Sequence, residues 1–275
     1  TRKESSAASD VYKRQAELIT NHIKDHHIDL QLETELQEIV GDQNGRVSKI
    51  ITNKGEEIEC QLVGLTAGVH PNVSFLKNTA LDVQKGIVVN RYLETNQKNV
   101  YAIGDCAEFS EPTNGRRAIE QVWYTGKMMG ETVANTICGN RVAYKPGHWY
   151  NSAKFFDIEY QTYGVVFPTL AENQAEFYWE HSKGKICMHF IFDKNTKEFI
   201  GINNFGIRLR HHAFDKWLTE KQSIEYVLTH LNDANFDPEF YKQYEGEIIA
   251  KYNQENNTNL QVKAKSWDRI LNLFN

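Results

Sequence analysis

Apolar residues recur at two different spacings in the first half of the chain. Between Ala16 and His27 they are three and four residues apart, which predicts an amphipathic helix. The run Leu62–Ala67 is almost entirely apolar, as is typical of a strand buried on both faces of a parallel sheet. Shorter alternating segments separated by turn residues predict further strands at 28–32, 36–40, 47–52, 57–60, 86–89 and 99–103.

The pattern changes near residue 144, where the segment 144–147 contains a Pro and a Gly. Before this point, 119–138 predicts a helix that ends at Gly139, with Gly126 and Gly130 on one side for close packing against a sheet. Beyond it, turns join strands predicted at 155–163, 176–181, 186–192 and 199–203, and helices follow at 212–232 and 238–253. We therefore expect an α/β fold up to about residue 143 and an α+β fold over 144–275.

Composition narrows the classes of function. The 275 residues carry a net charge of −5, which argues against nucleic acid as a partner because phosphate binding needs a basic surface. No apolar run approaches the roughly 18 residues of a membrane-spanning helix. The four cysteines form no CxxC pair and the ten histidines no HExxH motif, so we expect no metal site. Reduced, buried thiols fit a cytoplasmic protein.

Two segments carry the candidate chemistry. The first, Thr66-Ala67-Gly68-Val69-His70-Pro71-Asn72, follows the predicted buried strand, and ligands of open α/β sheets bind beyond such strand ends. The second is Tyr101-Ala102-Ile103-Gly104-Asp105, in which Gly104 leaves room for a ligand and Asp105 can accept a hydrogen bond from a hydroxyl group. The alternative is that both are ordinary strand exits, with Asp105 as a helix N-cap.

Taken together, with Gly68 and Asp105 37 positions apart, the two segments resemble the FAD-dependent pyridine nucleotide (disulfide) oxidoreductases. The first is similar to their A-T-G-x-x-P-N strand exit, although this chain has Thr-Ala-Gly, and the second is similar to their A-x-G-D flavin motif. The resemblance implies partial FAD- and NAD(P)-binding Rossmann-like domains. It implies cofactor contacts from Thr66, Ala67, Gly68, Gly104 and Asp105, and from Val122, Trp123 and Tyr124 at a helix start facing the flavin pyrimidine.

The G-x-G-x-x-G loops with which that family holds FAD and NAD(P)H phosphates do not occur in the chain. The resemblance therefore implies an N-terminally truncated member, similar to rubredoxin and ferredoxin reductases. Residues 1–15 are expected to be a disordered or non-native leader, because Asp10–Gln15 back-translates to a string resembling a transposon end used in sequencing libraries. The expected divisions are 16–72 for the end of the NAD(P)-binding domain, 73–143 for a second FAD-domain segment and 144–275 for an interface domain.

The implied activity is hydride transfer from NAD(P)H to FAD, followed by electron transfer to an acceptor such as a small carrier protein. No side chain of this chain is expected to act as a catalytic acid or base, and the fragment itself is expected to be inactive. A homodimer is compatible with this interpretation. The resemblance also disfavours a thiol–disulfide mechanism, because it implies a H-P-x-x-x-E motif in the interface domain of disulfide reductases and no His-Pro pair follows residue 144. An NADH oxidase or quinone reductase of the same family remains an alternative, as does a non-catalytic interaction or scaffold protein.

Overall fold

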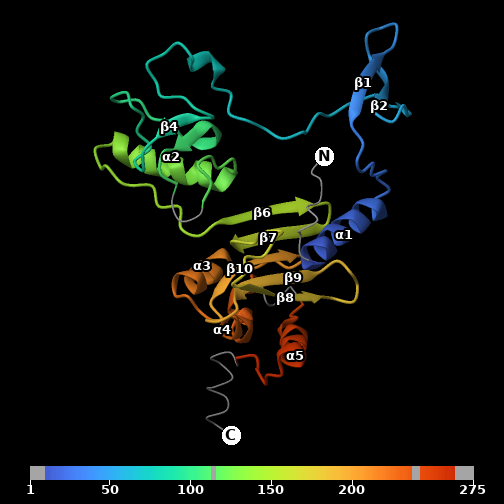
Figure 1. Ribbon diagram of the computed structural model, residues 1–275, viewed down its shortest axis with the longest axis vertical. Coiled ribbons are helices and arrows are strands. Elements are labelled where there is room, and N and C mark those ends of the chain that lie inside the picture. The colour runs from blue at the N-terminus through green and yellow to red at the C-terminus, as the bar shows by residue number, and fades with distance from the viewer. Residues whose placement is uncertain (1–9, 113–115, 237–241, 264–275) are drawn as a thin grey trace. The chain divides into compact units, whose positions relative to one another are not determined.

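The computed structural model describes residues 10–112, 116–236 and 242–263. The chain divides into two compact units, Thr1–Val69 and His70–Asn275 (Figure 1). Among the residues described, no helix combines the length and apolar character needed to cross a membrane.

The first unit contains one helix and one small sheet. Helix α1 (Asp10–Asp25) begins before Ala16, so residues 10–15 of the expected leader are helical rather than disordered. Strands β1 (Leu36–Gly41), β2 (Val47–Thr52) and β3 (Glu57–Glu59) form an antiparallel sheet in that order, which confirms the predicted strands and hairpin. The turn between β1 and β2 is closed by the carboxylate of Asp42, which accepts hydrogen bonds from the main-chain N–H groups of Asn44 and Arg46 at 2.8 and 2.9 Å.

Two predicted strands of this unit do not form. Segment 28–32 is irregular, and Leu32 is 64% exposed. The run 62–67 also lacks strand structure, with Leu62 and Leu65 86% and 74% exposed. An apolar run becomes a buried strand only when neighbouring strands bond its backbone and cover its faces. Within the described residues of this unit, β1, β2 and β3 pair with one another and no strand pairs with 62–67.

The second unit opens with a compact α/β segment. Strands β4 (Ile87–Val89) and β5 (Ala107–Phe109) form a two-stranded parallel sheet, and helix α2 (Trp123–Ile137) accompanies it (Figure 1). The strand expected at 99–103 is reduced to an isolated bridge from Tyr101 to Glu94. Two 3-10 turns, η1 (Ser74–Leu76) and η2 (Gly104–Cys106), complete the segment. The buried core comprises Val89, Leu93, Ala102, Ala107, Phe109, Met129, Val133 and Tyr144.

An antiparallel five-stranded sheet forms the rest of the second unit. Its order is β6-β7-β10-β9-β8, in which β8, β9 and β10 are the predicted meander. Most of the strand expected at 155–163 is β7, and it is preceded by β6, which was not expected, across a turn at Phe156, where φ is +53°. The bounds are β6 (Tyr150–Phe155), β7 (Ile158–Gly164), β8 (Gln174–Glu180), β9 (Cys187–Asp193) and β10 (Phe199–Phe205).

Three helices cover one face of this sheet: α3 (His211–Thr219), α4 (Ile224–Thr229) and α5 (Glu245–Asn256) (Figure 1). The expected helix 212–232 is broken, because Lys221 takes a φ of +52° and Ser223 then caps α4 by accepting from the N–H of Tyr226 at 3.2 Å. The last 3-10 turn is η3 (Leu231–Ala234). Of the helix expected at 238–253, residues 238–241 lie outside the described residues, and α5 begins at Glu245. The mixed α/β class is confirmed.

Candidate functional site

The turn at Gly104 and Asp105 is open on the side that a ligand would approach. It follows the extended residue Ile103, and Gly104 has a φ of +74°, a conformation that favours glycine. A Cβ atom placed on Gly104 would have nothing within 4 Å. Asp105 is exposed, and within the described part of the chain its carboxylate has no hydrogen-bond or ion-pair partner. The turn therefore presents a free acceptor beside an unobstructed backbone.

The start of α2 offers hydrogen-bond donors. The N-cap residue Val122 is extended, with φ −137° and ψ 146°, and provides no side-chain cap. The first helical bond runs from the N–H of Gly126 to the carbonyl of Val122 at 3.2 Å, so the N–H groups of Trp123, Tyr124 and Thr125 have no partner within the helix. The first turn also carries no acidic residue. This end of α2 is therefore a positively polarised group of donors suited to an anionic or carbonyl-bearing ligand.

The turn and the helix are in direct contact. The N–H of Gly104 points to the Sδ atom of Met129 at 3.2 Å. A Cβ atom on Gly126 would lie 3.7 Å from the Cα atom of Gly104, whereas one on Gly130 would meet nothing within 4 Å. The close packing predicted for Gly126 is thus directed at the motif itself, and the expectation for Gly130 was wrong. The structure brings together Gly104, Asp105 and the start of α2, which lie almost twenty residues apart in the chain.

The two aromatic residues that begin α2 have different surroundings. Trp123 is 71% exposed, and the ammonium group of Lys127 lies 5.7 Å from its ring centre. Tyr124 is half-buried, and its hydroxyl bonds to Oγ of Ser152 at 2.8 Å while its ring lies 4.8 Å from that of Tyr150. Sequence analysis missed Ser152 and Tyr150, because no local pattern indicates which distant strand a helix will touch.

Thr66, Ala67 and Gly68 belong to the first unit. All three are exposed, and Gly68 has a φ of +96°. They do not end a buried strand, because 62–67 forms none. The group of candidate residues that the structure assembles is therefore confined to the second unit.

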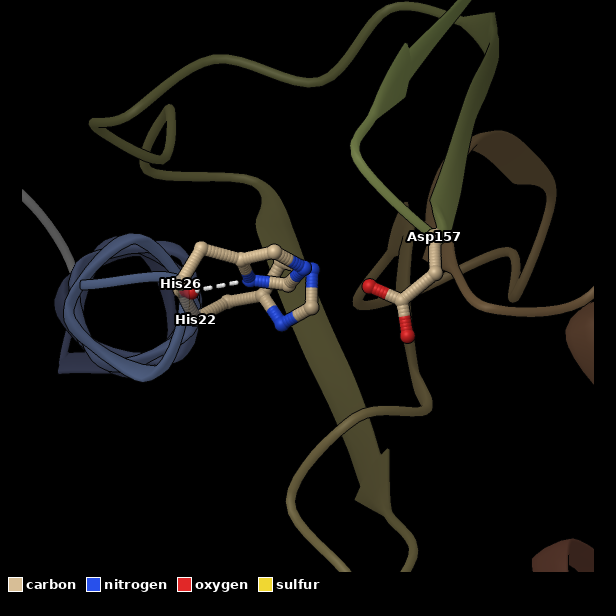
Figure 2. A group of neighbouring side chains, drawn as sticks. All are labelled: His22, His26 and Asp157. Carbon is tan, nitrogen blue, oxygen red and sulfur yellow. Dashed lines mark hydrogen bonds between the residues drawn. The ribbon is translucent and has the colours of Figure 1, made fainter. Parts of the chain in front are cut away.

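Histidines of α1 form a pair that the sequence analysis did not consider. His22 and His26 are four residues apart and are therefore neighbours on the helix surface. The Nδ1 atom of His26 donates to the main-chain oxygen of His22 at 2.9 Å (Figure 2). The two rings meet edge to face with centres 4.4 Å apart. The contact secures the last turn of the helix, and the absence of a metal site stays an expectation.

Comparison with known proteins shows what the chain resembles. A family model described as pyridine nucleotide-disulphide oxidoreductase matches residues 4–130. An NADH oxidase of Streptococcus pyogenes is 25% identical over 247 residues, covering 83% of this chain and 52% of the relative. A rubredoxin-NAD(+) reductase of Ectopseudomonas oleovorans is 31% identical over 124 residues, covering 45% of this chain and 32% of the relative. The chain thus spans about half or less of the length of these relatives.

Among solved structures, an NAD-dependent persulfide reductase from A. fulgidus aligns with a TM-score of 0.71 and 19% identity, over 91% of this chain and 49% of that one. The chain therefore shares a mixed α/β fold with that structure. The resemblance expected from the two motifs is confirmed, because residues 4–130 match the family model of the pyridine nucleotide-disulphide oxidoreductases.

Proposed function

We propose that the chain is part of an NAD(P)H-dependent flavoprotein oxidoreductase whose second unit holds the flavin end of FAD. The observation that carries the proposal is the packing of the Gly104–Asp105 turn against the uncapped start of α2. A free carboxylate and free N–H groups are thereby fixed close to one another. These are the acceptor and the donors that a polyol chain attached to a carbonyl-bearing ring requires.

In this proposal Asp105 accepts a hydrogen bond from a ribityl hydroxyl, and Gly104 allows the chain to pass its backbone. The N–H groups of Trp123 and Tyr124, following the extended Val122, face the pyrimidine ring and stabilise negative charge there. Thr66, Ala67 and Gly68, which belong to the first unit, are proposed as further cofactor contacts. When held by these residues, FAD would supply the redox chemistry, namely acceptance of hydride from NAD(P)H and release of electrons to an acceptor.

The proposed acceptor is a small redox carrier protein, because one relative is named a rubredoxin-NAD(+) reductase. The second candidate is an NADH oxidase, favoured by the relative of that name that matches 83% of the chain. We further propose that residues 16–72, 73–143 and 144–275 are the nicotinamide, flavin and interface portions, respectively. We also propose that the protein is a homodimer and that it is located in the cytoplasm. Residues 1–275 alone should not oxidise NADH, because the chain has no G-x-G-x-x-G loop to hold the cofactor phosphates.

The test begins with recovery of the upstream reading frame and expression of the extended protein. Two Gly-rich fingerprints and a yellow protein with flavin absorbance are expected. Asp105→Ala should weaken FAD binding about 10- to 100-fold, the effect of losing a hydrogen bond to a charged group. Asp82→Ala, which removes an equally exposed carboxylate of the same unit, should leave binding unchanged. A colourless extended protein, or equal binding by the two variants, would refute the proposed function.

A further inference from the structure

We propose that Tyr124 is a positioning residue that ties the start of α2 to the sheet of residues 150–205. The effect of Tyr124 on flavin binding rests on the proposed function, whereas the link between α2 and the sheet does not. The main-chain N–H of Tyr124 is one of the free donors of α2, and its side chain leaves the helix towards β6. One residue thus joins the candidate binding groups to a sheet that begins 26 residues later in the chain.

The first link is a hydrogen bond and a ring contact. The hydroxyl of Tyr124 lies 2.8 Å from Oγ of Ser152, and both side chains are half-buried. The ring of Tyr124 lies 4.8 Å from that of Tyr150, inclined at 48°. Both partners belong to β6, so Tyr124 is held from two points along one strand. A side chain held in this way restricts the first turn of α2 in both rotation and translation.

The second link anchors that strand residue in the core. The ring of Tyr150 stacks on the imidazole of His211 with centres 3.8 Å apart and an angle of 29°. His211 is the first residue of α3 and also lies 5.5 Å from the ring of Tyr163. Tyr163 is buried, stacks on Phe214 at 4.7 Å and donates to the carbonyl of Leu209 at 3.0 Å. The contacts therefore run without a break from α2 into the main core.

The burial of His211 favours the stack. Its buried Nδ1 atom has no hydrogen-bond partner within the described part of the chain. Burial lowers the pKa of His211, as do the neighbouring His212 and His148, against the opposing effect of Asp215. The ring is thus neutral at pH 7 and can lie flat against Tyr150 without burying a charge.

The other contacts near this junction hold a different segment. Arg116 forms an ion pair with Glu120, donates to the carbonyl of Gly147 at 3.2 Å, and lies 5.2 Å from the ring centre of Trp149. Both Arg116 and Glu120 precede α2, and their contact with the first turn is the bond from the hydroxyl of Thr125 to the carbonyl of Glu120 at 3.2 Å, so they hold the approach to the helix. The side chain of Tyr124 therefore supplies the link from the first turn of α2 to β6.

The first experiment uses the 275-residue chain and measures amide hydrogen exchange. Tyr124→Phe and Ser152→Ala should each speed exchange at residues 126–129 about three- to tenfold, the effect of one hydrogen bond. The double variant should show no further increase, because both changes remove the same bond. Tyr101→Phe, a matched change at a half-buried tyrosine, should have no effect at these amides.

Amide hydrogen exchange in β9 distinguishes loss of a local contact from general loss of stability. The exchange rates in β9 should be unchanged in every variant. Unchanged exchange at residues 126–129, additive effects of the two substitutions, or equal acceleration in β9 would each refute the inference. His211→Phe, which keeps a flat ring against Tyr150, should retain slow exchange, whereas His211→Ala should not.

A second experiment separates this inference from the proposed function. In the flavin-loaded extended protein, Tyr124→Phe should shift the flavin absorbance maximum and weaken flavin binding about threefold. The control Asp82→Ala should leave the wild-type spectrum unchanged. A tie seen by exchange in a protein that binds no flavin would refute the proposed function alone. A flavoprotein with an Asp105 effect but no change on Tyr124→Phe would refute the positioning role alone.

Discussion

The main-chain N–H of Gly104 donates to the thioether sulfur of Met129 at 3.2 Å, across 25 positions of the chain. Sulfur is a weak acceptor, yet it is polarisable and is held at a fully buried position in the helix. The contact fixes the position of the Gly104–Asp105 turn along the axis of α2. Met129 is therefore a structural residue on which the geometry of the candidate site depends.

Shortening Met129 should destabilise the second unit strongly. Met129→Ala leaves a cavity and an N–H without an acceptor, so a loss of about 3 kcal/mol in the free energy of unfolding is expected. Met129→Leu keeps the volume and should cost about 1 kcal/mol. Urea denaturation followed by circular dichroism measures both. A loss of less than about 0.5 kcal/mol for the alanine variant would contradict the packing described.

Removal of the Tyr144 hydroxyl should stabilise the protein. The ring stacks on Phe109 with centres 5.3 Å apart, but the buried hydroxyl has no hydrogen-bond partner among the residues that the structure describes. Burial, and then the charge of Glu120, raise the pKa of Tyr144 to about 12, so the group is neutral. Tyr144→Phe should raise the free energy of unfolding by about 1 kcal/mol, because an unsatisfied polar group is removed.

A matched control is Tyr163→Phe, which deletes a hydroxyl that donates to the carbonyl of Leu209 at 3.0 Å and should cost about 1 kcal/mol. The cavity beside Tyr144 measures about 20 Å³, room for a single water molecule. A loss of stability in Tyr144→Phe would show that the hydroxyl is satisfied after all.

Acid should weaken the ion pair of Glu94 and Arg141. Two hydrogen bonds of 2.7 Å join their side chains, and the guanidinium lies 3.5 Å from the ring centre of Tyr92. The hydrogen bond from Arg141, aided by Asn90, lowers the pKa of Glu94 from 4.5 to about 2. Since the pKa is lower in the folded state, the contribution is complete above pH 4.5 and is lost as the pH falls towards 2.

Chemical denaturation between those pH values should therefore show a steeper fall in stability for the wild type than for Glu94→Gln. Arg141→Lys keeps the charge but not the paired geometry, and should fall between the two. Parallel pH profiles for wild type and Glu94→Gln would contradict the ion pair.

Two glycines of similar backbone conformation should differ in their tolerance of alanine. Gly164 and Gly184 have φ values of +71° and +67°. A Cβ atom on Gly164 would lie 2.2 Å from the carbonyl oxygen of Ile200, whereas one on Gly184 would meet nothing within 4 Å. Gly184→Ala should cost about 1 kcal/mol, from the backbone conformation alone. Gly164→Ala should cost about 2 kcal/mol more, from the forced separation of β7 and β10. Equal melting temperatures would contradict this.

Charged residues should be tolerated in the segment predicted as a buried strand. Leu62 and Leu65 are exposed, so Leu62→Lys with Leu65→Lys should change the free energy of unfolding by less than about 0.5 kcal/mol. Leu93→Lys, at a position with no exposed surface, should lower the free energy of unfolding by several kcal/mol. It serves as the reference for the effect of a lysine at a buried position. A comparable loss in the double variant would restore the buried-strand interpretation.

The elements that local chemistry controls could be predicted from sequence. The hairpins at Asp42–Arg46 and between β2 and β3 are closed by side chains and glycines within a few residues of one another. The turn at Gly104 and Asp105, and a helix over most of 119–138, belong to the same class. In each case the determining interactions span four or five residues, and a short segment carries all of the information.

Tertiary structure decided the rest. The positive φ of Lys221 splits one predicted helix, and that of Phe156 joins β7 to β6, a strand that was not predicted, although neither residue type favours that conformation by itself. The run 62–67 has the composition of a buried strand but lacks a paired neighbour in its unit. The contacts of Gly104 with Met129 and of Tyr124 with Ser152 join segments 25 and 28 positions apart. Such pairings depend on the packing of whole elements, which periodicity along the chain does not encode.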